Sequence, residues 1–199
     1  MSFRKEKKFL LSYSDMTLFK EKIFSYGMRH LYPSRQVNSC YFDNDQLTMF
    51  HESEEGVLPR KKVRVRWYNK GVKYIKEIKV SSIEGRYKIS DKLISSHSLE
   101  EIEALDFFDE IYGVLKSVLI ISYQREYYSF ENLRITFDTA IKYTDLRASS
   151  RNIFEDEECV MEIKVPIDCG EDYIEDLIFY PTSRFSKYSR GLLKADWML

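Results

Sequence analysis

Hydrophobic and polar residues alternate with a period of two along much of this chain. The segment RKKVRVRWY, residues 60–68, carries basic side chains at every second position, with Val63, Val65 and Trp67 between them. On a β-strand, such alternation sends the charged groups to one face and the apolar groups to the other. The pattern therefore predicts a strand with one basic face and one apolar face.

The same reading predicts strands along most of the sequence. They cover residues 3–13, 37–43, 60–68, 73–80, 117–130, 133–143 and 159–166, with a short strand at 86–89. Residues 60–80 form a predicted hairpin that turns at 69–71. Residues 52–56 are interpreted as an acidic turn, and residues 149–158 as a loop.

Helical spacing predicts three helices. The first begins at an N-cap on Ser14 or Asp15 and extends to Tyr32–Pro33. The second covers residues 98–117, where Ser98 and Glu101 form a capping box. The third covers residues 171–179, before the segment TSRFSKYSRGLL, in which the stretch around Lys187 is interpreted as a loop.

Nearly every predicted strand carries charges on one side, and this admits two interpretations. One side of an antiparallel sheet is commonly solvated, so the charged faces are simply exposed in the first interpretation. In the second, the helices cover the apolar faces of a curved sheet and the charged faces look inward. An α+β fold with an antiparallel barrel and a polar lumen follows. Cations converging there repel one another unless carboxylates, water or a polyanion neutralise them, which points to a triphosphate site.

Composition narrows the function. The 199 residues, 44% of them hydrophobic, suit one domain over residues 1–199. Lys and Arg number 31 and Asp and Glu 32, so the basic strands are local concentrations, and a nucleic-acid partner is not expected. Three cysteines without metal-type spacing indicate reduced thiols and a cytoplasmic protein. No apolar run is long enough for a signal peptide or a membrane span.

The opening segment FRKEKKF resembles the ExExK strand of the triphosphate tunnel metalloenzymes, with Arg4 in place of the first Glu. An RxExK start is instead similar to the polyphosphate polymerase domain of the vacuolar transporter chaperone (VTC) complex and its bacterial stand-alone relatives. Further matching segments follow in order: SCYFD (39–43), RKKVRVRWY (60–68), EIKV (77–80), GRYK (85–88), YQREYY (123–128), LRITFD (133–138), MEIKV (161–165) and SRFSKYSRG (183–191). The resemblance covers nearly the whole chain.

This resemblance implies an eight-stranded antiparallel barrel, the triphosphate tunnel, with helices packed outside. It implies catalytic roles for six basic residues: Lys8, Arg64, Arg66, Lys79, Arg134 and Lys187. It implies substrate binding by five more: Arg4, Lys62, Lys88, Arg125 and Lys164. Glu162 and Glu6 are the implied ligands of Mn²⁺ or Mg²⁺, and Asp138 is a secondary helper. Tyr41, Phe42 and Trp67 are interpreted as packing residues, and the histidines receive no chemistry.

Several assignments have an alternative interpretation from the residues themselves. Arg64, Arg66 and Arg134 would lie on a solvated face, and Lys187 and Lys88 would be surface lysines. In the alternative for Glu162, its carboxylate forms a salt bridge with a neighbouring lysine or arginine on the same face and binds no metal. In the alternative for Arg125, its guanidinium pairs with Glu126 or with an acid at the barrel rim instead of binding the substrate. The missing first Glu argues against the two-metal hydrolase arrangement and fits the polymerase branch.

The expected activity is transfer of the γ-phosphoryl group of ATP to a growing polyphosphate chain. Two alternatives stay open: hydrolysis of tripolyphosphate or nucleoside triphosphate on the same tunnel, and polyphosphate binding without catalysis. A membrane-protein partner is compatible with the resemblance. The sequence does not indicate the oligomeric state, the physiological metal or the product length.

Overall fold

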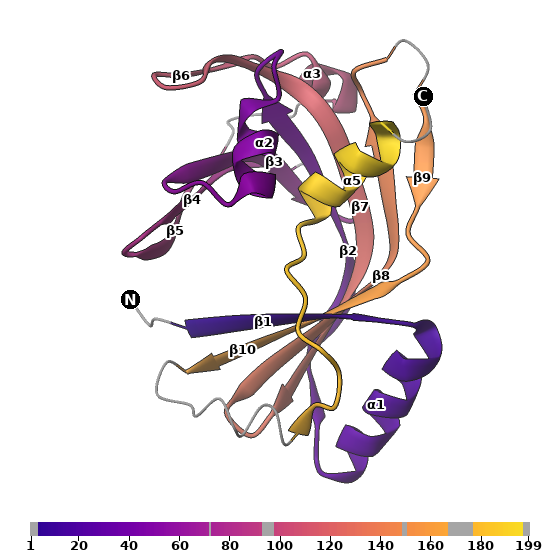
Figure 1. Ribbon diagram of the computed structural model, residues 1–199. Coiled ribbons are helices and arrows are strands. Elements are labelled where there is room, and N and C mark those ends of the chain that lie inside the picture. Colours follow the sequence, from indigo (N-terminus) through magenta and orange to yellow (C-terminus); the bar gives the residue numbers. More distant parts are fainter. Residues whose placement is uncertain (1–3, 72, 93–97, 149–150, 167–176, 197–199) are drawn as a thin grey trace. The chain divides into compact units, whose positions relative to one another are not determined.

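The computed structural model describes residues 4–71, 73–92, 98–148, 151–166 and 177–196, which form an antiparallel sheet with few helices (Figure 1). The strands are β1 (Arg4–Leu11), β2 (Arg29–Asp43), β3 (Arg60–Tyr68), β4 (Ile75–Ser82), β5 (Gly85–Lys92), β6 (Phe107–Asp109), β7 (Gly113–Phe130), β8 (Leu133–Asp145), β9 (Ile153–Glu155) and β10 (Cys159–Pro166). The helices are α1 (Tyr13–Ser25), α2 (Thr48–Glu55), α3 (Leu99–Glu103) and α5 (Lys187–Asp196).

Eight strands lie on one hydrogen-bonded path within the described residues, in the order β1-β10-β8-β7-β2-β3-β4-β5. Two strands of three residues lie off this path: β6 pairs with β7, and β9 pairs with β8. The sheet therefore has ten described strands, and the sequence missed the two short ones because three residues are too few to display a period of two.

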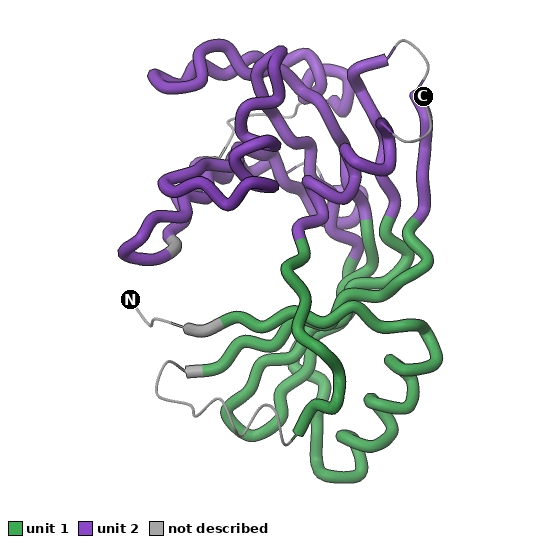
Figure 2. Tube along the Cα trace, in the orientation of Figure 1, with its two compact units in different colours: residues 1–35, 123–141, 156–185 green, residues 36–122, 142–155, 186–199 purple. Residues whose placement is uncertain are grey.

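The chain divides into two compact units (Figure 2). Unit 1 comprises residues 1–35, 123–141 and 156–185, and unit 2 comprises residues 36–122, 142–155 and 186–199. Strands β2, β7 and β8 each contribute residues to both units. The prediction of a single domain over residues 1–199 is not tested by this division into two units, and it stays a prediction.

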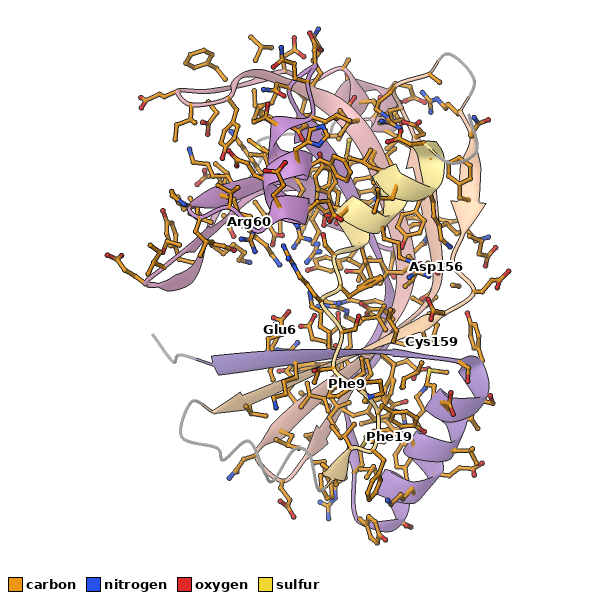
Figure 3. The ribbon with its side chains drawn as sticks, viewed as in Figure 1. Glu6, Phe9, Phe19, Arg60, Asp156 and Cys159 are labelled. Atoms are coloured by element: carbon orange, nitrogen blue, oxygen red, sulfur yellow. The ribbon has the colours of Figure 1, made fainter. Side chains whose placement is uncertain are left out.

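Unit 1 has its apolar core between α1 and one face of β1, β10 and β8. Glu6 and Phe9 point to opposite sides of β1, and Phe9 points toward Phe19 of α1 (Figure 3). Phe19 also meets Phe137 of β8, with 6.0 Å between the ring centroids. Met161 of β10 completes this contact region. The helix thus covers the apolar side of these strands and leaves their charged side uncovered.

Unit 2 is built in the same way around β2 and β3. Its core holds Cys40, Val63 and Val65 from the strands, together with Met49 from α2 and Ile102 from α3. Of the three predicted packing residues, Phe42 and Trp67 lie in this core, which confirms them. Tyr41 does not, because it lies on the polar side of β2.

Helix α1 ends earlier than the predicted boundary at Tyr32–Pro33. The backbone N–H groups of Gly27 and Met28 donate to the carbonyls of Phe24 and Ile23, at 3.0 Å each, which is a Schellman ending. Gly27 adopts φ +105°, a conformation that glycine accepts without steric cost. The helix also starts earlier, because Ser12 rather than Ser14 or Asp15 is its N-cap.

Helix α2 replaces the predicted acidic turn at residues 52–56. Asp43 accepts hydrogen bonds from the backbone N–H groups of Met49 and Phe50, at 3.1 and 3.0 Å, and so caps the first turn. The acidic run HESEEG obscured this helix, since the side chains that bury it, Met49 and Phe50, precede the run.

The predicted helix over residues 98–117 was wrong beyond its first turn. The capping box of Ser98 and Glu101 is confirmed, but α3 ends at Glu103. The following residues form the β6–β7 hairpin, in which Asp109 pairs with Gly113. Phe108 and Ile111 had helical spacing, yet their exposed fractions are 75% and 70%, so their spacing did not indicate a buried face.

The remaining predictions fare differently. Strands 60–68 and 159–166 are confirmed at both ends, and β1, β4, β7 and β8 to within a few residues. The strand predicted at 37–43 ends as expected, but β2 begins at Arg29, within the predicted first helix. Residues 171–176, most of the last predicted helix, lie outside the described residues. Lys187 opens α5 and is not in a loop. None of the described helices combines the length and apolarity needed to cross a membrane.

Candidate functional site

One face of β1, β10, β8 and β7 in unit 1 gathers charged side chains. The strand register places Lys8 opposite Glu162, Glu6 opposite Lys164, and Lys164 opposite Arg134. We call this the unit 1 polar face; its residues are Glu6, Lys8, Arg125, Arg134, Thr136, Asp138, Glu162 and Lys164. It lies opposite the face that α1 covers, as the inward-facing interpretation of the charged strands requires.

The two predicted metal ligands, Glu6 and Glu162, lie on neighbouring strands and share one lysine. Lys164 Nζ is 3.1 Å from Glu162 Oε1 and 3.6 Å from Glu6 Oε2. Lys8 Nζ is 3.3 Å from Glu6 Oε1 and donates to the carbonyl of Phe185 at 3.1 Å. The salt bridge considered for Glu162 is therefore present, and metal binding stays a prediction.

The donor chemistry nevertheless fits a hard divalent ion. Two carboxylates already enclose one cationic group, the Lys164 ammonium, and Mg²⁺ is commonly held by one or two carboxylates together with substrate phosphates. No cluster of three or more His, Cys, Asp or Glu suited to a metal occurs in the described part of the chain.

Arg125 is paired with an acid, as its alternative interpretation predicts, but this acid is Asp138 and not Glu126. Its Nε and Nη2 donate to the two oxygens of Asp138 at 2.5 and 2.6 Å, and Asp138 is fully buried. Burial by itself would lower the pKa of Arg125, but the Asp138 carboxylate outweighs it and raises that pKa. Glu126 instead pairs with Lys20 and accepts from the Tyr128 hydroxyl. Asp138 therefore fixes the plane of the Arg125 guanidinium.

Two buried polar atoms of this face lack a hydrogen-bond partner within the described residues: Arg134 Nε and Thr136 Oγ1. Thr136 lies directly opposite Glu162 in the sheet, and Arg134 opposite Lys164. An unsatisfied buried donor is costly, so such atoms call for an explanation, for example a ligand. Both lie among groups that suit phosphate oxygens.

Unit 2 has its own charged face on β2, β3, β4 and β5. The register aligns Tyr41, Arg64 and Glu77 in one row across β2, β3 and β4. The unit 2 polar face consists of Ser39, Tyr41, Lys62, Arg64, Arg66, Glu77, Lys79 and Lys88.

Glu77 organises the cations of this face, and it was not among the predicted site residues. Its Oε2 accepts from Arg64 Nε at 2.7 Å and lies 3.8 Å from Arg66 Nη1, while Oε1 accepts from Lys88 at 3.0 Å. Burial would raise the pKa of Glu77, but Arg64 and Arg66 lower it to about 2. The signal was present in the sequence: EIKV occurs at 77–80 and at 162–165, so Glu77 corresponds to Glu162.

Tyr41 is a polar member of this face. Its hydroxyl oxygen accepts from Arg64 Nη1 at 2.9 Å, and its ring stacks on Tyr188 of α5 with centroids 4.9 Å apart and 13° between the planes. Tyr188 in turn donates to Asp43 at 2.6 Å. Among the described residues nothing accepts the Tyr41 hydroxyl proton. Burial would raise the pKa of Tyr41, but Arg64 and Arg66 lower it.

The predicted lysines of unit 2 form a row. Lys62 lies opposite Lys79, and Lys79 opposite Lys88, across β3, β4 and β5. Lys62 Nζ donates to Ser186 Oγ at 2.8 Å, and Lys79 and Lys88 are exposed. Like charges on directly opposed residues destabilise a sheet, and a polyanion would relieve this repulsion.

Two of the predicted basic residues, Lys187 and Arg4, are not assigned to either polar face. Lys187 is the first residue of α5 and is half-buried, next to Ser186 and Tyr188. The backbone of Arg4 belongs to β1, but its side chain lies outside the described part of the structure. The other predicted basic residues lie on one of the two polar faces.

Several solved structures superpose on this chain over nearly its whole length, which shows that they share its fold. A candidate adenylate cyclase from Bacillus halodurans superposes with a TM-score of 0.58 at 15% identity, covering 95% of this chain and 97% of that one. A Vibrio parahaemolyticus protein of the same description gives 0.55 at 13%, covering 96% and 98%. A Hippeastrum protein, described as a candidate adenylyl cyclase with a dominant triphosphatase activity, gives 0.54 at 15%, covering 96% of each chain.

No curated protein sequence matches the chain. The model of the VTC domain matches residues 3–195, which is nearly the whole sequence. The chain is a member of the VTC domain family.

Proposed function

We propose that this protein is an ATP-dependent polyphosphate polymerase. The observation that carries this proposal is a pair of buried polar atoms, Arg134 Nε and Thr136 Oγ1, for which the described part of the chain supplies no hydrogen-bond partner. They lie beside Glu162 and Lys164 in a VTC domain. The proposal also includes a closed eight-stranded barrel and a cytoplasmic location, and both remain predictions. Buried free thiols at Cys40 and Cys159 support the location.

The reaction moves one phosphoryl group. A terminal oxygen of the polyphosphate chain forms a new bond to the γ-phosphorus of ATP, the bond from that phosphorus to the β–γ bridging oxygen breaks, and ADP leaves. Phosphoryl transfer depends mainly on positioning and charge neutralisation, so no protein nucleophile is needed. Arginine forks and lysine ammoniums supply both, in accord with the catalytic roles predicted for Lys8, Arg64, Arg66, Lys79, Arg134 and Lys187.

Glu6 and Glu162 would hold the divalent ion, Mn²⁺ or Mg²⁺. When bound, such an ion neutralises charge on the transferring phosphate. The carboxylates of Asp138 and Glu77 have a different role, because each is committed to arginine. They hold Arg125 and Arg64 in fixed orientations, so less entropy is lost when these groups bind phosphate.

A second function receives support from one neighbour. The Hippeastrum protein is described by a dominant triphosphatase activity, and the same cations would serve if water replaced the polyphosphate acceptor. The likeness is one of fold alone, so hydrolysis of tripolyphosphate ranks second. Binding of polyphosphate without turnover ranks third.

Incubation of the purified chain with ATP and Mn²⁺ or Mg²⁺, with products resolved by phosphorus NMR, tests the proposal. Chains longer than three phosphates together with ADP are expected. Orthophosphate as the only new product would favour hydrolysis, and unchanged ATP despite measurable polyphosphate binding would favour a binding module.

A carboxylate variant tests the metal assignment. Glu162→Gln should abolish turnover and keep part of the affinity for tripolyphosphate, because the cations remain. Glu155→Gln is the matched control, since Glu155 is exposed and pairs only loosely with Lys142 at 3.5 Å. Full activity of Glu162→Gln would remove Glu162 from the metal site.

A further inference from the structure

A groove of about 320 Å³ opens beside the unit 1 polar face. Arg134 and Lys164 of that face line it, and so does one acidic residue, Glu131. The remaining lining residues are Leu31 and Tyr32 from β2, Asn132 from the turn between β7 and β8, and Leu133. Its volume lies at the lower end of the range of small-molecule pockets, roughly 300–1,000 Å³. The groove thus joins a partly apolar wall to two of the cations that suit phosphate.

Tyr32 gives this groove an aromatic surface. Its exposed fraction is 54%, and its ring meets Tyr127 edge-on, with centroids 5.8 Å apart and 80° between the planes. Tyr127 is itself fixed, because its hydroxyl accepts from Arg35 Nε at 2.9 Å. The neighbouring aromatic ring therefore supports Tyr32, while more than half of the side chain stays open to a ligand.

Arg134 links the aromatic surface to the charged face. Its guanidinium carbon lies 5.8 Å from the centroid of Tyr32 and 5.5 Å from that of Tyr127. A tyrosine ring beside a guanidinium plane is the kind of surface on which a flat nucleobase stacks. The buried Nε of Arg134 still lacks a partner within the described residues, so the same side chain retains a donor for a phosphate oxygen.

We propose that this groove binds the base and ribose of a nucleoside triphosphate, the donor in the proposed function. The base stacks on Tyr32, the Asn132 amide hydrogen-bonds to its edge, and Arg134 and Lys164 bind the phosphates. Lys164 contacts Glu162, so a nucleotide held in this way brings its phosphates to the carboxylates. The groove consequently distinguishes a nucleotide from inorganic tripolyphosphate, which has no base.

Affinities for two ligands test this assignment. We would measure binding of ATP and of tripolyphosphate by calorimetry to the full chain and to Tyr32→Ala. Loss of one base–aromatic stack should weaken ATP binding by roughly 5- to 150-fold. Tripolyphosphate affinity should change by less than about twofold, since surface substitutions rarely perturb the fold. Equal weakening of both ligands, or unchanged ATP affinity, would overturn the assignment.

Two further variants make the test specific. Tyr87→Ala is the matched control, because Tyr87 is a strand tyrosine with an exposed fraction of 53% that does not line the groove, and both affinities should stay unchanged. Tyr32→Trp should retain ATP affinity through its larger ring. The fluorescence of ethenoadenosine triphosphate reports stacking directly, and its change on binding should disappear in Tyr32→Ala alone.

The outcomes separate this assignment from the proposed function. Failure of the groove as a base site leaves ATP turnover and tripolyphosphate affinity in place, with ATP bound no more tightly than tripolyphosphate. Failure of the proposed function shows as absent phosphoryl transfer by the unmodified chain, whatever the ratio of the two affinities.

Discussion

A buried carboxylate orients an arginine in each of the two polar faces. In unit 1, Asp138 accepts two hydrogen bonds from Arg125, and in unit 2, Glu77 accepts one from Arg64 Nε. Removing one member of a buried pair leaves the other charge uncompensated, which is more costly than losing an exposed salt bridge. These acids therefore matter both for stability and for the geometry of the cations.

Glu77→Gln should destabilise the protein by about 3 kcal/mol at neutral pH, the free energy that corresponds to its lowered pKa. Because the pKa of Glu77 is lowered in the folded state, its stabilising effect is present above pH 4.5 and is lost as pH falls toward about 2. Urea unfolding at pH 7 and pH 3 measures this. The stability difference between variant and parent should shrink at pH 3, and a constant difference would contradict the role of the charge.

Tyr41→Phe should weaken tripolyphosphate binding by roughly 10- to 100-fold, the range for a hydrogen bond to a charged group. Within the described residues the phenol proton has no acceptor, so we expect a phosphate oxygen to accept it. Calorimetry on the Phe variant measures the loss. Tyr112→Phe is the control, because Tyr112 is equally buried but donates to Glu52 at 2.6 Å.

The pH dependence of binding separates this role from simple packing. The pKa of Tyr41 is lowered, so the phenol loses its proton at a lower pH than an ordinary tyrosine, and the phenolate repels phosphate. Affinity should therefore fall on the alkaline side in the parent and less so in Tyr41→Phe. The charged and titratable groups that face Tyr41 are Lys62, Arg64 and Arg66 of β3, Glu77 of β4 and Tyr188 of α5. If the affinity of both proteins fell in the same way at alkaline pH, the Tyr41 hydroxyl would have no part in binding.

At the scale of elements, α5 is closely fitted to unit 2. A Cβ added at Gly191 would lie 2.5 Å from Tyr143 Cδ1 and 2.7 Å from Leu119 Cδ2. The same helix begins with Lys187 and Tyr188, beside the unit 2 polar face. The fit at Gly191 therefore sets where these side chains lie.

Gly191→Ala should destabilise the protein by about 1–3 kcal/mol, although alanine favours helices, because the added methyl group overpacks the interface. Tripolyphosphate affinity should also fall as α5 shifts. Thermal unfolding and calorimetry measure the two effects. Leu193→Ala, at a more exposed position on the same helix, should change affinity little, and a stabilised Gly191→Ala protein would show that α5 has room to move.

At the scale of the whole molecule, a formal net charge of −1 conceals two polar faces whose basic side chains, nine in all, outnumber the four acidic ones. Binding that depends on such local charge weakens with added salt. A ligand that binds the folded state also stabilises it, by about 2.7 kcal/mol at one hundred times its Kd.

Tripolyphosphate should accordingly raise the Tm by roughly 5–10 °C at that saturation, given the usual 2–4 °C per kcal/mol for a chain of this size. The shift should shrink as NaCl increases. Differential scanning fluorimetry measures it, with sulfate as the control anion. A shift of equal size with sulfate would indicate general anion binding without selectivity for condensed phosphates.

The sequence predicted the strands well because alternation reports directly which face is buried. It predicted which side of each strand carries the charges for the same reason, since Arg64 and Val65 must point in opposite directions. It failed at residues 104–112, where Phe108 and Ile111 are apolar but exposed. It also missed Glu77 and the polar role of Tyr41, because their importance comes from partners on other strands, which spacing within one strand does not reveal.

The position of β5 at the end of the described strand path has a consequence for local dynamics. A terminal strand separates from the sheet at a lower free energy than an inner one, and here Lys88 of β5 opposes Lys79 of β4 while it also pairs with Glu77 of β4. Amide hydrogens in β5 should thus exchange with solvent faster than those in β3, and a bound polyphosphate should slow them selectively. Occupancy by the substrate and order in this hairpin are then thermodynamically linked.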